Sequence, residues 1–373
     1  MNIGIDARLL ERKITGIGRF LINLLENFPL YDKENKYFLF TYSTIKFNPE
    51  FYTNIPTIRG FLPQKIFSPI WCNFILPYYL KKHKIDLLFS ANQVVPLIKV
   101  KNCKYISVVH DVIYKADPNF LPFIYRNYLK LFAHFSVKVS DLIITVSEYS
   151  KSDILKNYNI DPNKIKVVLQ FPNPFFQPYQ VGEDEKLELK KQFGISEKIV
   201  LYVGMIENRK NIQTILKVAD RIKEFSPNIS FVIVGKIGYG GEKIISEIQK
   251  RDNVIHLMNI DDYTLKKLYN ISDVFLFPSF YEGFGYPPLE AMQSGLPVIS
   301  SNNTSLKELI AEGGILCDPE DVNSIVRETI KLLTDKIHWE NIRKAGIERS
   351  KKFSLEKSVR EIIDIFNSIK KFN

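Results

Sequence analysis

The sequence is poor in cysteine and lacks the long apolar runs of a membrane protein. Its three cysteines, Cys72, Cys103 and Cys317, lie far apart without a C-x-x-C pair, so neither a disulfide framework nor a zinc site is indicated. The aromatic-rich run of residues 67–80 contains two prolines and is too short to cross a bilayer. The first residues, MNIGIDARLL, lack the basic start and apolar stretch of a secretory signal. We therefore expect a cytoplasmic protein without a transmembrane helix.

Motifs for a metal and for a dinucleotide are also missing. The sequence has no convincing D-x-D motif. In the segment TGIGR, residues 15–19, Gly16 and Gly18 lack the third glycine and the later acid of a dinucleotide fingerprint. NAD binding is therefore not supported, and we expect neither a cofactor nor a metal.

Positive charge is unevenly distributed. Residues 1–180 hold 23 Lys and Arg against 13 Asp and Glu, which accounts for the whole net charge of +10. Such a basic half favours an anionic partner, among them a phosphorylated lipid, a membrane surface or a nucleic acid. A solubilising surface explains it equally well. The segment of residues 71–84, WCNFILPYYLKKHK, could contact lipid or form a helix packed on the sheet.

A chain of 373 residues is long enough for two domains. Apolar strand-like runs alternate with helical segments, which predicts an α/β fold of parallel sheets covered by helices. The predicted strands are residues 3–6, 37–41, 86–90, 105–110, 142–146 and 165–169 in the first half, and 199–204, 230–235, 254–257, 274–278, 297–300 and 313–316 in the second. The pattern breaks at the proline-rich segment that begins near Gln170. We expect one domain over residues 1–175, a second over residues 182–353, and a C-terminal helix, residues 354–373, that returns to the first.

The most informative segment is FPSFYEGFGYPPLEAMQSGLPVI, residues 277–299. A strand, a glycine loop and a helix start follow one another, and this order places unpaired N–H groups and a positive helix end toward an anion. The glycines allow a close approach to the backbone. Glu282 and Glu290 flank the turn and could accept hydrogen bonds from sugar and ribose hydroxyls, although two ordinary surface glutamates would give the same pattern.

Two further segments place polar side chains after strands. In LYVGMIENRKN, residues 201–211, Arg209 and Lys210 follow a glycine turn at Gly204 and could neutralise a diphosphate. In VVHD, residues 108–111, His110 ends a buried strand, an edge where open α/β sheets bind ligands. Each feature alone could be a solvated loop or a histidine satisfied by the nearby backbone.

Taken in order, these segments resemble the retaining GT-B glycosyltransferases of glycosyltransferase family 4 over nearly the whole chain. The resemblance is most specific at EGFGYPPLEAMQSGLPV, where Glu282 and Glu290 match the E-x7-E pair. SEYSKSDIL and NTSLKEL, which begin at Ser147 and Asn303, also match. The chain departs from the family in LQFPNPFFQP, where Pro174 replaces a glycine.

The resemblance implies a GT-B fold, two Rossmann-like domains facing each other across a cleft. Residues 1–175 would form the acceptor domain, and residues 182–353 the nucleotide-sugar-binding domain. The resemblance also implies a metal-independent glycosyltransferase that moves a hexose from a nucleotide-diphosphate sugar to a glycan or polyprenyl-diphosphate-linked acceptor in surface polysaccharide or lipopolysaccharide synthesis. Mannose- or rhamnose-type transfer is favoured, at the inner face of the cell membrane. The residues it assigns to catalysis are His110, Glu282, Arg209 and Lys210. The residues it assigns to donor binding are Gly16, Gly18, Gly204, Gly283, Phe284, Gly285 and Glu290.

Three other interpretations remain open. A nucleotide-sugar epimerase or dehydrogenase would need the missing glycine fingerprint. A catalytically degenerate, membrane-associated partner protein would be expected to lose the paired glutamates or the Arg–Lys pair. A nucleic-acid binder would explain the basic half but not the acidic glycine turn, so no nucleic-acid partner is expected.

Overall fold

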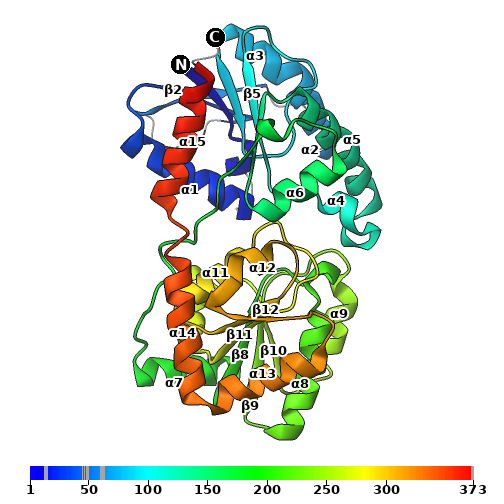
Figure 1. The fold of residues 1–373 in the computed structure, drawn as a ribbon, viewed down its shortest axis with the longest axis vertical. Coiled ribbons are helices and arrows are strands. Elements are labelled where there is room, and N and C mark those ends of the chain that lie inside the picture. The colour runs from blue at the N-terminus through cyan, green and yellow to red at the C-terminus, as the bar shows by residue number, and fades with distance from the viewer. Residues whose placement is uncertain (12–15, 44, 46, 48–49, 59–63, 371–373) are drawn as a thin grey trace. The chain divides into compact units, whose positions relative to one another are not determined.

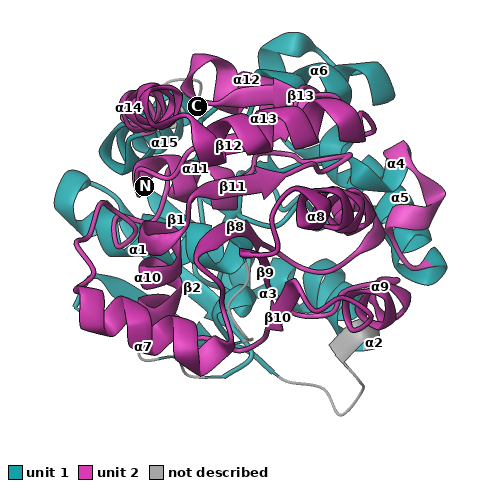
Figure 2. Ribbon diagram, turned by 90° about the horizontal axis from the view of Figure 1, so that it is seen from below, with its two compact units in different colours: residues 1–115, 123–170, 354–373 teal, residues 116–122, 171–353 magenta. Residues whose placement is uncertain are grey.

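The computed structural model describes residues 1–11, 16–43, 45, 47, 50–58 and 64–370 (Figure 1). The chain divides into two compact units, coloured separately in Figure 2. The first unit comprises residues 1–115, 123–170 and 354–373, and the second comprises residues 116–122 and 171–353.

The first unit is built on a parallel sheet. Within its described residues, seven strands lie in the order β3-β2-β1-β4-β5-β6-β7. The strands are β1 Asn2–Asp6, β2 Lys36–Thr41, β3 Tyr52–Pro56, β4 Leu87–Ser90, β5 Lys104–Val109, β6 Leu142–Thr145 and β7 Ile165–Val167. Its helices include α1 Gly16–Tyr31, α2 Gln64–Ile70, η2 Trp71–Ile75, α3 Leu76–Lys82, α5 Phe123–Val139, α6 Glu148–Asn157 and α15 Leu355–Lys370.

The second unit repeats this design. Its described residues form six parallel strands in the order β10-β9-β8-β11-β12-β13. The strands are β8 Lys198–Val203, β9 Ile229–Val234, β10 Val254–Leu257, β11 Val274–Phe277, β12 Val298–Ser301 and β13 Ile315–Cys317. The helices are α7 Glu183–Phe193, α8 Ile212–Phe225, α9 Gly241–Ile248, α10 Asp262–Ile271, α11 Tyr286–Gln293, α12 Thr304–Ile310, α13 Val322–Thr334 and α14 Lys336–Ser350.

The prediction of parallel sheets covered by helices is confirmed. In β9 every residue of the sequence ISFVIV is buried, as expected for a strand covered on both faces. Ser147 caps α6, since its side chain accepts a hydrogen bond from the backbone N–H of Ser150.

The segment of residues 71–84 packs on the first sheet. It forms the π-helical turn η2 and the helix α3, and the side chains of Trp71, Leu76 and Leu80 are buried in a core cluster that includes residues of β4 and β5. Phe74 and Tyr78, on the other side, are 70% and 62% exposed. Of the two predicted roles, packing on the sheet is therefore confirmed for one face of the segment.

The core of the first unit also holds a buried ion pair. The guanidinium of Arg8 lies 2.6 Å from a carboxylate oxygen of Asp6 and 3.9 Å from the centroid of the Trp71 ring. The Trp71 indole N–H donates to the hydroxyl of Thr57 at 2.6 Å. The end of β1 is thereby joined to the segment that precedes α3.

The C-terminal helix α15 belongs to the first unit. The ring of Phe366 packs against Phe28 of α1 and Phe89 of β4, with ring centroids 5.9 and 5.3 Å apart. The hydroxyl of Ser358 donates to the backbone carbonyl of Leu169 at 2.6 Å. The first unit is therefore completed by a segment that follows the whole second unit in the sequence.

Candidate active site

The predicted acidic and basic residues of the second unit form one cluster at the carboxyl edge of its sheet. Arg209 and Lys210 follow β8, and Glu282 follows β11, the neighbouring strand. Lys210 donates a short hydrogen bond to one oxygen of Glu282, and Arg209 donates to the other at 3.0 Å. The sheet topology thus brings together residues that are 72 and 73 positions apart in the sequence.

Glu207 and Ser279 complete the cluster, and the sequence analysis did not identify either. A carboxylate oxygen of Glu207 lies 2.7 Å from Nε of Arg209, and the Ser279 hydroxyl donates to Glu282 at 2.8 Å. The two carboxylates and the two cations have a formal sum of zero. The only sequence signal for Glu207 is its position two residues before Arg209.

The neighbouring cations, and not burial, set the protonation of Glu282 in this cluster. Burial alone would raise the pKa of Glu282, but the charges of Lys210 and Arg209 outweigh it and lower the pKa to about 2. Burial and the charge of Arg209 lower the pKa of Lys210, while Glu282 opposes that change. Glu282 is therefore a carboxylate at neutral pH, held as the shared acceptor of two cations.

The loop that carries Glu282 is fixed from the start of α12. The Ser305 hydroxyl donates to the backbone carbonyls of Glu282 and Phe284, at 2.8 and 2.9 Å, and the Asn303 amide donates to the carbonyl of Phe280 at 3.2 Å. These contacts give the segment NTSLKEL a structural role. They hold residues 280–284 in place ahead of α11.

Glycines shape the turns at this edge. Gly285 precedes α11 with φ +119°, a backbone conformation that disfavours other residues. Gly204, at the end of β8, meets the turn after β9 so closely that a Cβ on Gly235 would lie 1.8 Å from the Gly204 carbonyl oxygen. Gly283 lies in the loop between Glu282 and α11.

Phe284 and Glu290 are largely enclosed by the protein. The ring of Phe284 packs against Tyr286 and Phe353, with centroids 5.5 and 5.8 Å apart, so its backbone is the part that the loop presents. Glu290, in α11, is buried and accepts a hydrogen bond from the Tyr269 hydroxyl at 3.2 Å.

In the first unit, His110 follows β5 and is buried. Its Nε2 donates to the Ala91 carbonyl at 3.0 Å, and its Nδ1 accepts from the Gln170 side-chain amide at 2.9 Å. Burial lowers the pKa of His110 to about 4. His110 is therefore a neutral imidazole whose two nitrogens are both engaged.

Gly16 and Gly18 also belong to the first unit, in the first turn of α1. Thr15, the first residue of the TGIGR segment, lies outside the described residues. The predicted site residues are thus divided between the units: His110, Gly16 and Gly18 in the first, and the others in the second.

In the described part of the chain, no group of three or more His, Cys, Asp or Glu side chains could hold a metal ion. Among the same residues, no helix is both long and apolar enough to span a bilayer.

Comparison with solved structures first defines the class of fold. Sucrose-phosphate synthase from Thermosynechococcus elongatus matches with a TM-score of 0.80 at 20% identity, over the whole of both chains. HepE from Anabaena, solved in complex with UDP-glucose, matches with a TM-score of 0.76 at 17% identity, over 99% of this chain and 100% of the other. Together with the two α/β units, these matches show the GT-B fold.

Comparison with known sequences then identifies the family. Residues 14–170 match the model described as Glycosyltransferase Family 4, and residues 185–349 match the one described as Glycosyl transferases group 1. The O-antigen chain mannosyltransferase B of Escherichia coli is 30% identical over 266 residues, which cover 70% of this chain and 69% of that protein. The chain belongs to glycosyltransferase family 4 and is a glycosyltransferase rather than an epimerase or dehydrogenase.

A second group of relatives is longer. The serotype-specific mannosyltransferase WbdA of Escherichia coli is 29% identical over 279 residues, which cover 71% of this chain but 34% of that protein. The chain therefore spans about a third of the length of WbdA.

Proposed function

We propose that the chain is a retaining, metal-independent hexosyltransferase that moves a mannose-type sugar from a nucleotide-diphosphate sugar to a glycan or lipid-linked acceptor. The relatives that support the sugar are the O-antigen chain mannosyltransferase B and WbdA, both named as mannosyltransferases. The name of the first also supports a role in the synthesis of a surface polysaccharide. The observation that carries the proposal is the cluster of Arg209, Lys210 and Glu282 at the edge of the second sheet.

In this proposal, the second unit binds the donor. The diphosphate contacts Arg209 and Lys210, and it thereby competes with Glu282 for the same two cations. Glu282, once released, accepts hydrogen bonds from hydroxyls of the donor sugar. As the bond to the diphosphate breaks, negative charge develops on the leaving group and both cations stabilise it.

The remaining donor contacts follow from the loop and from α11. The backbone N–H groups of residues 283–285 and the positive end of the α11 dipole favour an anion ahead of the helix. Gly204 lets the turn after β8 approach the turn after β9 closely. Glu290 lies one turn into α11 and is assigned to the ribose hydroxyls. Gly16 and Gly18, at the start of α1, are assigned to the phosphates, and His110 is assigned to a position beside the donor sugar.

The first experiment is a thermal shift of the full chain against UDP, GDP, dTDP and CMP, each with and without magnesium. A ligand at about 100 times its Kd adds about 2.7 kcal/mol to the free energy of unfolding. A shift with one diphosphate, unchanged by magnesium, selects the base for a transfer assay with the corresponding mannose donor. If no nucleotide shifts the melting temperature and no transfer is detected, the catalytically degenerate alternative gains support.

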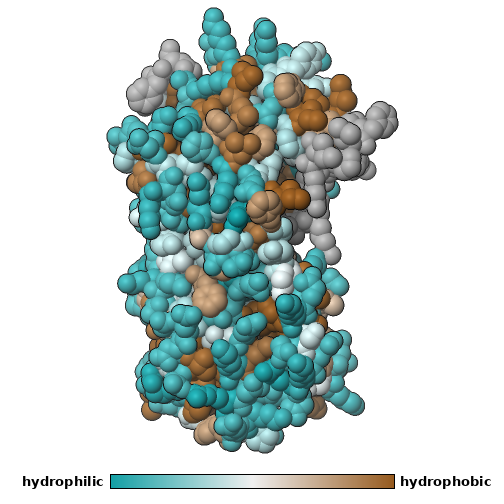
Figure 3. Space-filling model, turned by 90° about the vertical axis from the view of Figure 1, so that its right-hand side faces the viewer, coloured by the Kyte–Doolittle hydropathy of each residue, from teal (hydrophilic) through white to brown (hydrophobic). Residues whose placement is uncertain are grey.

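We also propose that the first unit rests on an anionic membrane surface. Two helices there expose apolar side chains at helical spacing. Ile124 and Leu131 of α5 are 82% and 54% exposed. Phe74 of η2 and Tyr78 of α3 are 70% and 62% exposed. The upper part of Figure 3, which belongs to the first unit, shows gathered hydrophobic side chains.

Neighbouring charges favour an anionic lipid surface as the partner of these two apolar rows. α5 carries Lys130 and Lys138, and α3 ends with Lys81 and Lys82. Apolar side chains flanked by lysines bind membranes through burial of apolar area and attraction to anionic headgroups. Phe132 of α5 packs against the core cluster that contains Trp71 of η2, so both rows lie on segments that cover the same core.

A vesicle assay tests the membrane proposal. We expect the protein to sediment with phosphatidylglycerol vesicles at low salt, much less with phosphatidylcholine vesicles, and the double variant Ile124→Ser, Leu131→Ser to lose most of this binding. Leu187→Ser is the matched control, because Leu187 is 68% exposed on α7 of the second unit. Equal binding by the double variant and the control would contradict the proposed surface.

A further inference from the structure

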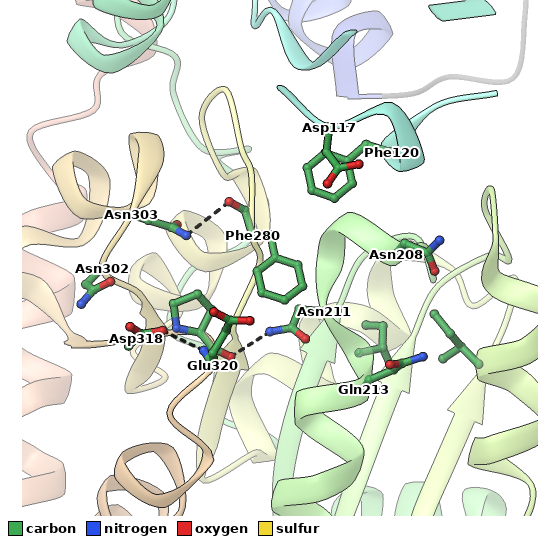
Figure 4. A pocket seen from close by; sticks show the side chains of 13 residues that line it. Asp117, Phe120, Asn208, Asn211, Gln213, Phe280, Asn302, Asn303, Asp318 and Glu320 are labelled. Carbon is green, nitrogen blue, oxygen red and sulfur yellow. Dashed lines mark hydrogen bonds between the residues drawn. The ribbon is translucent and has the colours of Figure 1, made fainter. Parts of the chain in front are cut away.

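A pocket lies in the second unit, beside the cluster of Arg209, Lys210 and Glu282. Its volume is about 660 Å³, within the range of about 300–1,000 Å³ that is usual for small-molecule sites. It opens at the carboxyl edge of the sheet, where residues after β8, β11, β12 and β13 surround it (Figure 4). The short helix η3, Pro118–Phe120, adds lining residues from the part of the second unit formed by residues 116–122.

The charge of this pocket differs from that of the cluster. Three carboxylates line it, those of Asp117, Asp318 and Glu320. Among the lining residues that the structure describes, none is a lysine, arginine or histidine. A diphosphate would be repelled here. A metal ion is also a poor fit, because the carboxylates do not form a group that could hold one.

Amide side chains supply the other polar groups. Asn208, Gln213, Asn302 and Asn303 line the pocket, and each amide carries both hydrogen-bond donors and an acceptor. Carboxylates add strong acceptors. Such a set matches a neutral ligand with many hydroxyl groups, each of which both donates and accepts.

Two aromatic rings add apolar surface. Phe120 and Phe280 lie on separate elements and both point toward the space (Figure 4). Phe280 is held firmly, since its backbone N–H donates to the Arg209 carbonyl at 2.8 Å and its carbonyl accepts from Asn303. Flat apolar faces among a few placed polar groups are typical of a site that orients a small ring.

The pocket adjoins the proposed donor site through the chain itself. Asn208 precedes Arg209, and Phe280 lies two residues before Glu282. A ligand in the pocket would therefore lie close to the sugar-transfer chemistry but away from its cations.

We propose that this pocket binds a neutral sugar residue of the acceptor glycan. The inference rests on the proposed function, because only a transferase needs an acceptor beside its donor. The acidic lining excludes the diphosphate end of the donor. The amides and carboxylates bind sugar hydroxyls, and Phe280 supports the face of the ring.

Ligand-observed NMR with mannose oligosaccharides tests the pocket. Methyl α-mannoside and α-linked mannotriose are titrated into the full chain and into two variants, Asn302→Ala and Glu320→Ala, whose side chains are exposed in the pocket. We expect saturation transfer to the trisaccharide with the wild type, and at least tenfold weaker binding by each variant. The control is Glu224→Ala, an exposed acid near the C-terminal end of α8 outside the pocket lining.

Nucleotide thermal shifts of the same variants separate the two proposals. If the nucleotide shift stays within twofold in apparent Kd while trisaccharide binding falls, the pocket serves the acceptor. If the wild type binds nucleotide but no oligosaccharide, or if both variants bind it like the control, the pocket proposal is overturned and the transferase proposal stands. If no nucleotide binds, the transferase proposal fails, whereas loss of oligosaccharide binding in the variants would still support a sugar site.

Discussion

Gln170 donates a hydrogen bond from its side-chain amide to Nδ1 of His110, 60 residues earlier in the chain. This contact fixes the tautomer, because Nδ1 must accept and Nε2 must therefore carry the proton that it donates to Ala91. His110 is therefore held as a neutral, oriented imidazole whose two ring nitrogens are engaged inside the first unit. It is not poised to act as an imidazolium ion at neutral pH.

The buried His110 predicts a pH dependence of stability. Its pKa is about 4 in the folded chain and about 6.5 in an unfolded one. Between these values, the unfolded chain binds a proton that the folded chain does not. Its stabilising contribution is therefore present above about pH 6.5 and is lost as the pH falls toward 4, on the order of 3 kcal/mol.

Thermal unfolding of the wild type and of His110→Asn at pH 7 and at pH 4.5 measures this effect. We expect the melting temperature of the variant to change less between the two pH values than that of the wild type. An equal change in both proteins would show that His110 does not contribute.

Glu282 gives a prediction in which binding and transfer move in opposite directions. In Glu282→Gln, the carboxylate that shares Arg209 and Lys210 is lost, so both cations become available to a diphosphate. We expect tighter binding of the nucleoside diphosphate but slower sugar transfer, since the acceptor for the sugar hydroxyls is weakened. Calorimetry with the nucleotide and a single-turnover assay measure the two effects.

A matched variant, Glu207→Gln, separates charge from sugar contact. It removes the other carboxylate beside Arg209 and should also tighten nucleotide binding, but it should leave transfer less impaired. Weaker nucleotide binding by Glu282→Gln would contradict the proposed competition.

Gly235 is predicted to tolerate no side chain. The Cβ of Gly235→Ala would lie 1.8 Å from the Gly204 carbonyl, so the two turns must separate. We expect the free energy of unfolding to fall by about 1–3 kcal/mol, the usual cost of overpacking. Nucleotide binding should also weaken. Gly182→Ala is the control, because a Cβ there meets nothing within 4 Å, and denaturant titration should show a change below about 1 kcal/mol.

The Arg8–Asp6 pair predicts strong coupling in the first unit. Arg8→Met leaves the buried carboxylate of Asp6 without its cation, and we expect a loss of about 3–5 kcal/mol. The double variant Arg8→Met, Asp6→Asn should recover part of that loss, because the unpaired charge is gone. If denaturant titration shows additive losses instead, the pair is not coupled.

Most of the fold could be predicted because buried parallel strands have continuous apolar sequences. Of the thirteen strands in the described residues, twelve were predicted from such runs within one or two residues at either end. The missed strand is β3, Tyr52–Pro56, where YTNIP contains two polar residues and one proline. It lies at the edge of the sheet, and edge strands need less apolar sequence.

The candidate site was only partly predictable. The paired glutamates and the Arg–Lys pair lie in recognisable segments, but their mutual contact depends on β8 and β11 being neighbours. Gln170 was assigned to a connection, although it orients His110. No sequence pattern marks residues 116–122 as part of the second unit, because these residues contact segments that lie far along the chain. The assigned roles of the site residues stay predictions.

The place of α15 has a consequence for how the protein is made on the ribosome. Phe28 and Phe89 are translated early, but their partner Phe366 emerges only after the whole of residues 171–353. Domains generally fold during synthesis with the N-terminal one first. Here completion follows the opposite order, because the second unit can fold while the first still exposes the apolar surface that α15 will cover. The N-terminal half of the nascent chain therefore keeps this surface uncovered until α15 has left the ribosome.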